Sequence, residues 1–97
     1  MNARQVVLRP VISEKSYALL AANKYTFRVH EGANKTQVRQ AIEEIFGVRV
    51  TAVRTAWVKP KPKRRGFSKG QRRRWKKAIV TLHQDDSIEL FEGQETG

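Results

Sequence analysis

The sequence of 97 residues predicts an α+β domain in which helices pack on a mixed or antiparallel sheet. Residues 24–30 and 77–83 alternate apolar and polar side chains, which is typical of half-buried strands. Residues 35–46 carry apolar side chains at helical spacing. Residues 48–58 are rich in β-branched side chains, so this run and residues 77–83 are expected to form an antiparallel hairpin.

The elements at the N-terminus are short. Residues 5–8 form an apolar run that ends at Arg9 and a proline, which predicts a brief edge strand. A helix is predicted over residues 14–22, because Ser13 can cap its first turn and Glu14 complements the helix dipole. Its buried stripe is expected to comprise Tyr17, Ala18, Leu20 and Ala21.

The strand predicted over residues 24–30 follows Asn23, which is expected to end the preceding helix in the left-handed conformation. Alternation divides this strand into an apolar face and a polar face that holds bases and no acids. The apolar face comprises Tyr25, Phe27 and Val29, and the polar face comprises Lys24, Thr26, Arg28 and His30.

The helix predicted over residues 35–46 has the clearest signals in the chain. Asn34 and Gln37 have the spacing of a capping box, and Gly47 is a typical stop. Its apolar stripe comprises Val38, Ala41, Ile42, Ile45 and Phe46. In the strand that follows, the apolar positions change parity, which predicts a β-bulge near Ala52.

The last strand, over residues 77–83, is expected to point Ala78, Val80 and Leu82 inward, with Ile79, Thr81 and His83 on the opposite face. One domain over residues 1–97 is predicted, with an extended basic loop over residues 59–75 and a loosely ordered end over residues 92–97.

The connection between the hairpin strands, residues 59–74, is sixteen residues long, and connections of that length are usually functional or disordered. Folded back on itself, it reaches about 25 Å from the sheet. Gly66 and Gly70 allow a turn at its tip, with Phe67 between them.

The excess positive charge lies in one segment. The formal net charge is +11, and residues 59–77 hold eleven of the 20 Lys and Arg residues and no acid. The rest of the chain is therefore formally neutral. Such a block repels itself until a polyanion neutralises it, and nucleic acid is the usual polyanion.

Other function classes have little support. His30 and His83 have no Ser, Cys or acid at a spacing that would build a catalytic relay or metal site, so neither an enzyme nor a metal or other cofactor is expected. The chain has no cysteine. It also has no apolar run long enough to span a bilayer, so a soluble cytoplasmic protein without membrane insertion is expected.

RNA is favoured over DNA, because a basic loop can order in the crevices of a folded RNA, whereas duplex DNA is usually read by a helix or ribbon. Trp75 either stacks on RNA or packs against Trp57 at the hairpin root. The candidate RNA-binding residues are Lys24, Arg28, Arg54, Lys59, Lys61, Lys63, Arg64, Arg65, Phe67, Lys69, Arg72, Arg73, Arg74, Trp75, Lys76 and Lys77. A free-standing RNA-binding module that uses the same loop is the alternative.

An ordered set of motifs resembles the bacterial form of the universal large-subunit ribosomal protein family numbered twenty-three. The set begins with Arg9 and Pro10 before the Ser13, Glu14, Lys15 triplet, and continues through IFGVRV, KPKPKRRG and RRRWKKAIVTL. The resemblance implies a structural protein of the large ribosomal subunit with no catalytic residue. It also implies an antiparallel four-stranded sheet of order 1-2-4-3 that is covered by helices.

The resemblance also implies the partners. The third domain of the large-subunit rRNA is the expected binding partner, beside the exit of the nascent-peptide tunnel. Ser13, Glu14 and Lys15 look like the docking site for the chaperone trigger factor, and contacts of the signal recognition particle and the translocon lie near the same surface. The ribosomal protein numbered twenty-nine is the expected protein neighbour.

Overall fold

The computed structural model describes residues 2–59 and 74–89. Four strands form one antiparallel sheet in the order β1-β2-β4-β3, which confirms the predicted class and strand order. The last strand of the chain therefore lies between the second and the third. The strands are β1 (Val7–Pro10), β2 (Lys24–Val29), β3 (Val50–Val58) and β4 (Trp75–Leu82).

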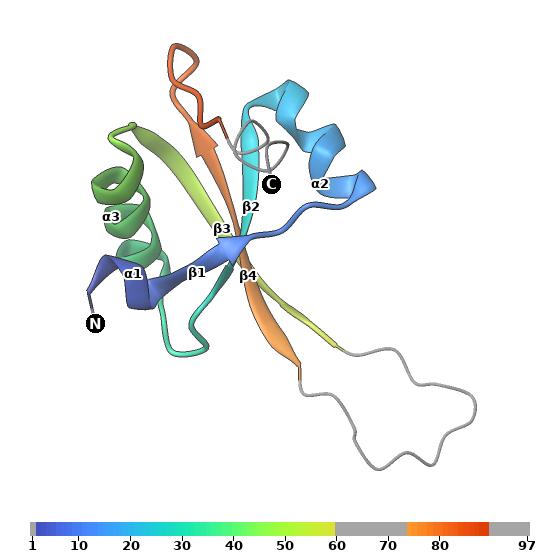
Figure 1. The fold of residues 1–97 in the computed structure, drawn as a ribbon, viewed down its shortest axis with the longest axis vertical. Coiled ribbons are helices and arrows are strands. Elements are labelled where there is room, and N and C mark those ends of the chain that lie inside the picture. Colours follow the sequence, from blue (N-terminus) through green and yellow to red (C-terminus); the bar gives the residue numbers. More distant parts are fainter. Residues whose placement is uncertain (1, 60–73, 90–97) are drawn as a thin grey trace.

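The helices lie on both sides of this sheet, as Figure 1 shows. The helices α1 (Ala3–Val6) and α3 (Lys35–Phe46) lie together on one side. The helix α2 (Glu14–Leu19) lies on the other side, continues as the 3-10 helix η1 (Leu20–Ala22), and contacts β2. No helix of the described residues covers the half of that second face toward the β3–β4 hairpin end.

The core lies between α3 and the sheet. Its largest fully buried side chains are Phe27, Ile42, Val29, Val38 and Val80. The Phe27 ring meets Phe46 of α3, with the ring centres 5.7 Å apart. The apolar faces predicted for β2, β4 and α3 are thus confirmed, because the side chains at those positions point into one shared interior.

Helix α3 begins and ends where the sequence predicts. Asn34 Oδ1 accepts from the Gln37 N–H at 2.9 Å, and Gln37 Oε1 accepts from the Asn34 N–H at 3.0 Å, so the capping box is formed. Gly47 has φ 67°, a left-handed conformation that glycine adopts at little cost.

The predicted brief edge strand is present as β1, but its bounds were wrong, because it covers Val7–Pro10 rather than residues 5–8. Asn2 and Gln5 form a capping box, which starts α1 at Ala3, and the strand begins only at Val7. A short apolar run is compatible with either a strand or a helix, so it does not distinguish the two. The buried Val6 of this run belongs to the helix.

The prediction for α2 was right at its N-cap and wrong about its buried face. Ser13 Oγ accepts from the Ser16 N–H at 3.2 Å, as a cap residue does. The buried residue of this helix is Ser16, whose hydroxyl donates to the Val11 carbonyl at 2.8 Å. Tyr17 is 61% exposed, and only Leu20 of the predicted stripe packs against the core. The predicted Ala18 and Ala21 are exposed.

The β3–β4 hairpin has the predicted form. The register shifts between Val50 and Ala52, which confirms the bulge, and Val58 pairs with Trp75 at the far end. Residues 59–74 therefore connect the two strands. Residues 60–73, which include the predicted tip, and residues 90–97, which include the predicted loose end, lie outside the described part of the chain.

Candidate nucleic-acid interface

The sheet face opposite α3 carries a row of bases. Arg28 of β2 pairs with Lys77 of β4, and Arg54 of β3 pairs with Ile79, two residues further along β4. Residues two apart on a strand share a face, so these side chains lie together on the side away from Phe27. Together with Trp75 we name this surface the open basic face, which comprises Arg9, Lys24, Arg28, Arg54, Trp75 and Lys77.

Trp75 lies among these cations. The Arg28 guanidinium carbon lies 5.1 Å from the centre of its ring, within the range of a cation–π interaction. A shallow cavity of about 300 Å³ lies beside the pair. It is lined by Arg9, Pro10, Val11, Ile12, Arg28 and Trp75. A planar ring beside fixed cations and a hollow is an arrangement that can receive an unstacked base and its phosphate.

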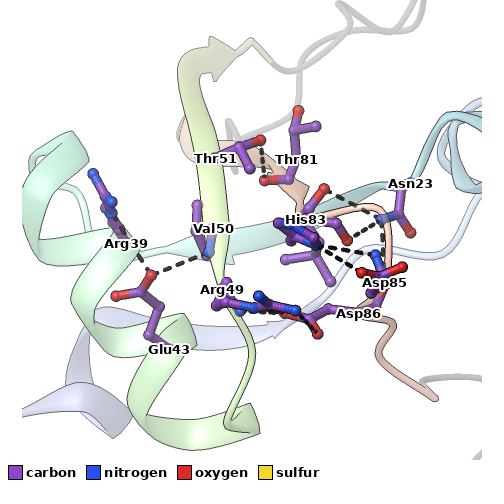
Figure 2. Close-up of polar contacts among 11 residues, drawn as sticks. Asn23, Arg39, Glu43, Arg49, Val50, Thr51, Thr81, His83, Asp85 and Asp86 are labelled. Atoms are coloured by element: carbon purple, nitrogen blue, oxygen red, sulfur yellow. Dashed lines mark hydrogen bonds and ion pairs between the residues drawn. The ribbon is translucent and has the colours of Figure 1, made fainter.

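Opposite charges are paired at the other end of the molecule. The described residues form two ion pairs, Arg39–Glu43 and Arg49–Asp86, and His83 Nδ1 lies 3.7 Å from Asp85 Oδ2. All three contacts lie near the start of β3 (Figure 2). Hydrogen bonds from the side chain and the backbone N–H of Arg49 hold the pKa of Asp86 below its ordinary value. The same contact raises the pKa of Arg49.

The open basic face has no such partners in the described part of the chain. Arg9 even pairs across the strands with Arg28, so two like charges lie side by side. Like charges at directly opposite positions are destabilising. This end of the molecule therefore carries uncompensated positive charge that a polyanion can neutralise.

The predicted RNA-binding residues other than Lys76 fall into three groups. Lys24, Arg28, Arg54, Trp75 and Lys77 share the open basic face, where Lys24 Nζ also donates to Thr81 Oγ1 at 3.4 Å. Lys59 and Arg74 flank the connection at the hairpin root, and both are exposed. The remaining predicted residues lie outside the described residues: Lys61, Lys63, Arg64, Arg65, Phe67, Lys69, Arg72 and Arg73.

Lys76 lies on the opposite face from the other predicted bases of β4. It pairs with Val29 and with Trp57, and its Nζ donates to the Ala33 carbonyl at 2.7 Å, on the side that α3 covers. Trp57 lies on that side too, whereas Trp75 lies on the open basic face. The alternative in which the two tryptophans pack against each other was therefore wrong, because the sheet separates them.

Arg9 is the residue of this surface that the sequence did not indicate. Its neighbourhood depends on the pairing of β1 with β2, in which Arg9 lies opposite Arg28. The sequence analysis expected a strand over residues 5–8, which excludes Arg9. An edge strand that includes Pro10, as observed, would have placed this arginine beside Arg28.

The triplet of Ser13, Glu14 and Lys15 lies at the start of α2. All three residues are exposed, and Glu14 is in the first turn, where its charge complements the helix dipole.

Among the described residues, no cluster of His, Asp and Glu could hold a metal ion. Within the same ranges, no helix has the length and apolar character to cross a membrane.

A small α+β domain with a basic sheet face that α2 covers only in part, and with the Trp75 ring among its cations, has the features of a nucleic-acid-binding protein. The sequence profile described as ribosomal protein L23 matches residues 5–90. The chain belongs to the ribosomal protein L23 family, and it is thus a non-enzymatic structural protein of the large ribosomal subunit.

Close relatives support this assignment. The chain is 55% identical over 93 residues to large ribosomal subunit protein uL23 of Roseiflexus castenholzii, covering 96% of this chain and 99% of the relative. It is 54% identical to the protein of the same name from Symbiobacterium thermophilum, with the same coverage. It is 48% identical over 94 residues to that of Kosmotoga olearia, covering 97% and 94%.

Proposed function

We propose that this chain binds large-subunit rRNA, in its third domain beside the exit of the nascent-peptide tunnel, through the open basic face and the basic connection of residues 59–74. The observation that carries the proposal is the segregation of charge. Bases at the start of β3 are paired with acids, whereas those around Trp75 have no acidic partner in the described ranges. Such a surface gains most from a polyanion.

The open basic face continues into the basic connection. Trp75 is the first residue of β4 and Val58 the last of β3, so the sixteen residues of the connection begin where the face ends. If about six to eight bases contact phosphates, affinity is expected to fall about a thousandfold or more between 50 and 200 mM salt.

The test uses a transcript of the third rRNA domain and the full chain. Arg28→Gln removes one phosphate contact and the cation over Trp75, so we expect about tenfold weaker binding and a smaller salt dependence. Arg39→Gln is the matched control, because Arg39 is an exposed arginine paired with Glu43 on α3. Equal effects of the two variants, measured by filter binding at several salt concentrations, would contradict the proposed surface.

We further propose that Ser13, Glu14 and Lys15 help to form the docking site for trigger factor, with the signal recognition particle and the translocon acting near the same surface. The exposure of all three at the start of α2 supports this role. The ribosomal protein numbered twenty-nine is the proposed protein neighbour, and the exposed apolar side chains of Leu8 and Ile12 offer it a contact surface.

Substitution of Glu14 tests the docking role. Glu14→Ala is expected to lower trigger factor recruitment to ribosomes while the protein still assembles into large subunits, because the side chain is exposed. Its contribution to stability through the helix dipole is only about 0.3–1 kcal/mol. Glu44→Ala, at an exposed glutamate of α3, is the control. Unchanged co-sedimentation of trigger factor with Glu14→Ala ribosomes would remove Glu14 from the docking site.

A further inference from the structure

The hairpin root presents one tryptophan on each sheet face. Trp57 of β3 lies opposite Lys76, and Trp75 of β4 lies opposite Val58. Lys76 and Trp75 are consecutive, so their side chains point to opposite faces, and the two indoles do the same. The open basic face therefore accounts for Trp75 and leaves Trp57 unexplained.

Trp57 is surrounded by cations. The Arg74 guanidinium carbon lies 4.1 Å from the ring centre, and Lys76 Nζ lies at 5.6 Å from the same centre. Lys76 is held there by its hydrogen bond of 2.7 Å to the Ala33 carbonyl. Trp57 nevertheless remains 39% exposed. Arg74, Lys76 and the accessible indole thus form a second basic and aromatic cluster, which we name the Trp57 cluster.

The composition of the cluster points to a polyanion with planar groups. Neither Arg74 nor Lys76 forms an ion pair with an acid in the described part of the chain. A guanidinium stacked on an indole is preorganised and can bond a phosphate or a base edge with its free N–H groups. The exposed part of the indole can stack a base.

Continuity with the basic connection favours RNA over an acidic protein. Arg74 is the last residue of the connection, and Trp57 lies two residues before its first residue, Lys59. An RNA strand that follows the connection would therefore pass the Trp57 cluster on one side of the hairpin root and the open basic face on the other.

We infer that the Trp57 cluster is a second RNA contact, so that the hairpin root lies between two RNA segments, one stacked on each tryptophan. This inference rests on the proposed RNA binding and specifies how the root is held. A protein that merely lies on an RNA surface would use only the open basic face.

Tryptophan fluorescence tests the two contacts separately. Trp75→Phe leaves Trp57 as the only indole, and Trp57→Phe leaves Trp75, and both changes keep an aromatic ring in a strand position. Each variant is titrated with the transcript of the third rRNA domain, after circular dichroism has confirmed its fold. We expect RNA to quench both indoles and to shield both from acrylamide, because bases stack on both.

The outcomes distinguish this inference from the proposed function. Quenching of Trp75 with no change at Trp57 would overturn the inference and leave RNA binding by the open face intact. Loss of binding altogether, with neither indole responding, would instead defeat the proposed function. A response of Trp57 to poly-glutamate and not to RNA would identify an acidic protein surface as the partner and would overturn the inference as well.

Affinities provide an independent measurement. Trp57→Thr removes the stacking surface and introduces a β-branched residue, which suits a strand. We therefore expect about tenfold weaker RNA binding, with a similar loss for Trp75→Thr. Because the two rings contact different RNA segments, the losses are expected to multiply to about a hundredfold in the double variant. Arg39→Gln again serves as the control, and an unchanged affinity for Trp57→Thr would contradict a second contact.

Discussion

Asn23 shows how a single side chain can end one element and hold another. Its backbone has φ 61°, a left-handed conformation that asparagine tolerates better than most residues. Its Nδ2 donates to the carbonyls of Leu82, His83 and Asp86 at 3.2, 2.9 and 3.2 Å (Figure 2). The sequence predicts the left-handed stop, whereas these bonds span about sixty residues and cannot be read from local spacing.

Two substitutions at Asn23 separate these contributions. Asn23→Gly keeps the left-handed conformation and removes the side-chain bonds, so we expect a loss of about 1–3 kcal/mol of unfolding free energy. Asn23→Ala adds backbone strain, which costs about 1–2 kcal/mol more. Urea denaturation measures both. Equal losses of unfolding free energy in the two variants would show that the left-handed conformation contributes nothing to stability. If the glycine variant were as stable as the wild type, the side-chain hydrogen bonds would contribute nothing.

At the scale of elements, the sequence predicts best where the signals are local. The bounds of α3 follow from Asn34, Gln37 and Gly47, all within or beside the helix. The face that α2 buries depends instead on the path of the chain after β1. The buried residue on that face is Ser16, and its hydroxyl donates to the Val11 carbonyl. Helical spacing alone selects Tyr17 for burial, although it is largely exposed.

The Arg49–Asp86 pair joins the start of β3 to the turn after β4. Asp86 accepts from the Arg49 backbone N–H at 2.7 Å and from its guanidinium at 3.2 Å. The pair links chain segments on either side of the basic connection, and it involves the same turn that Asn23 holds. Both contacts lie at the end of the sheet where Val50 pairs with Leu82, away from the hairpin root where Val58 pairs with Trp75.

The Arg49–Asp86 pair predicts how stability depends on pH. The pKa of Asp86 is lower in the folded chain than in the unfolded chain, so its stabilising effect is present above the unfolded pKa of about 3.9 and is lost as the pH falls through the folded value. Asp86→Asn is therefore expected to lower the thermal midpoint at pH 7 and to reduce the acid dependence of that midpoint. Glu89→Gln, at an exposed acid outside the pair, is the control. Parallel melting curves against pH for wild type and Asp86→Asn would contradict the linkage.

At the scale of the molecule, the charge of the candidate site is readable from the sequence and its two-sided geometry is not. The run of bases and the position of the hairpin follow directly from residues 48–83. Which face each tryptophan occupies depends on the β3–β4 register. A two-residue turn would fix that register, but a connection of sixteen residues leaves it to packing and to the bulge after Val50.

Deletion of residues 66–70 tests whether the connection is separable from the fold. None of the paired residues of β3 and β4 falls within the deleted stretch. A shorter connection also costs slightly less entropy to close. The thermal midpoint is expected to stay unchanged or rise slightly, whereas affinity for the rRNA transcript falls. Circular dichroism and filter binding measure the two. Loss of cooperative unfolding would show that the deleted residues belong to the core.

The sheet order also has a consequence for the way the protein is made. The strand that bridges β2 and β3 is the last to leave the ribosome that synthesises this chain, so no sheet of four strands can close until β4 has emerged. Until then β2 lacks β4, the strand that pairs with it along one edge. The basic segment emerges before the strand that completes the fold. Because the basic segment precedes the strand that completes the sheet, we expect neutralisation of its charges by RNA to be coupled to folding.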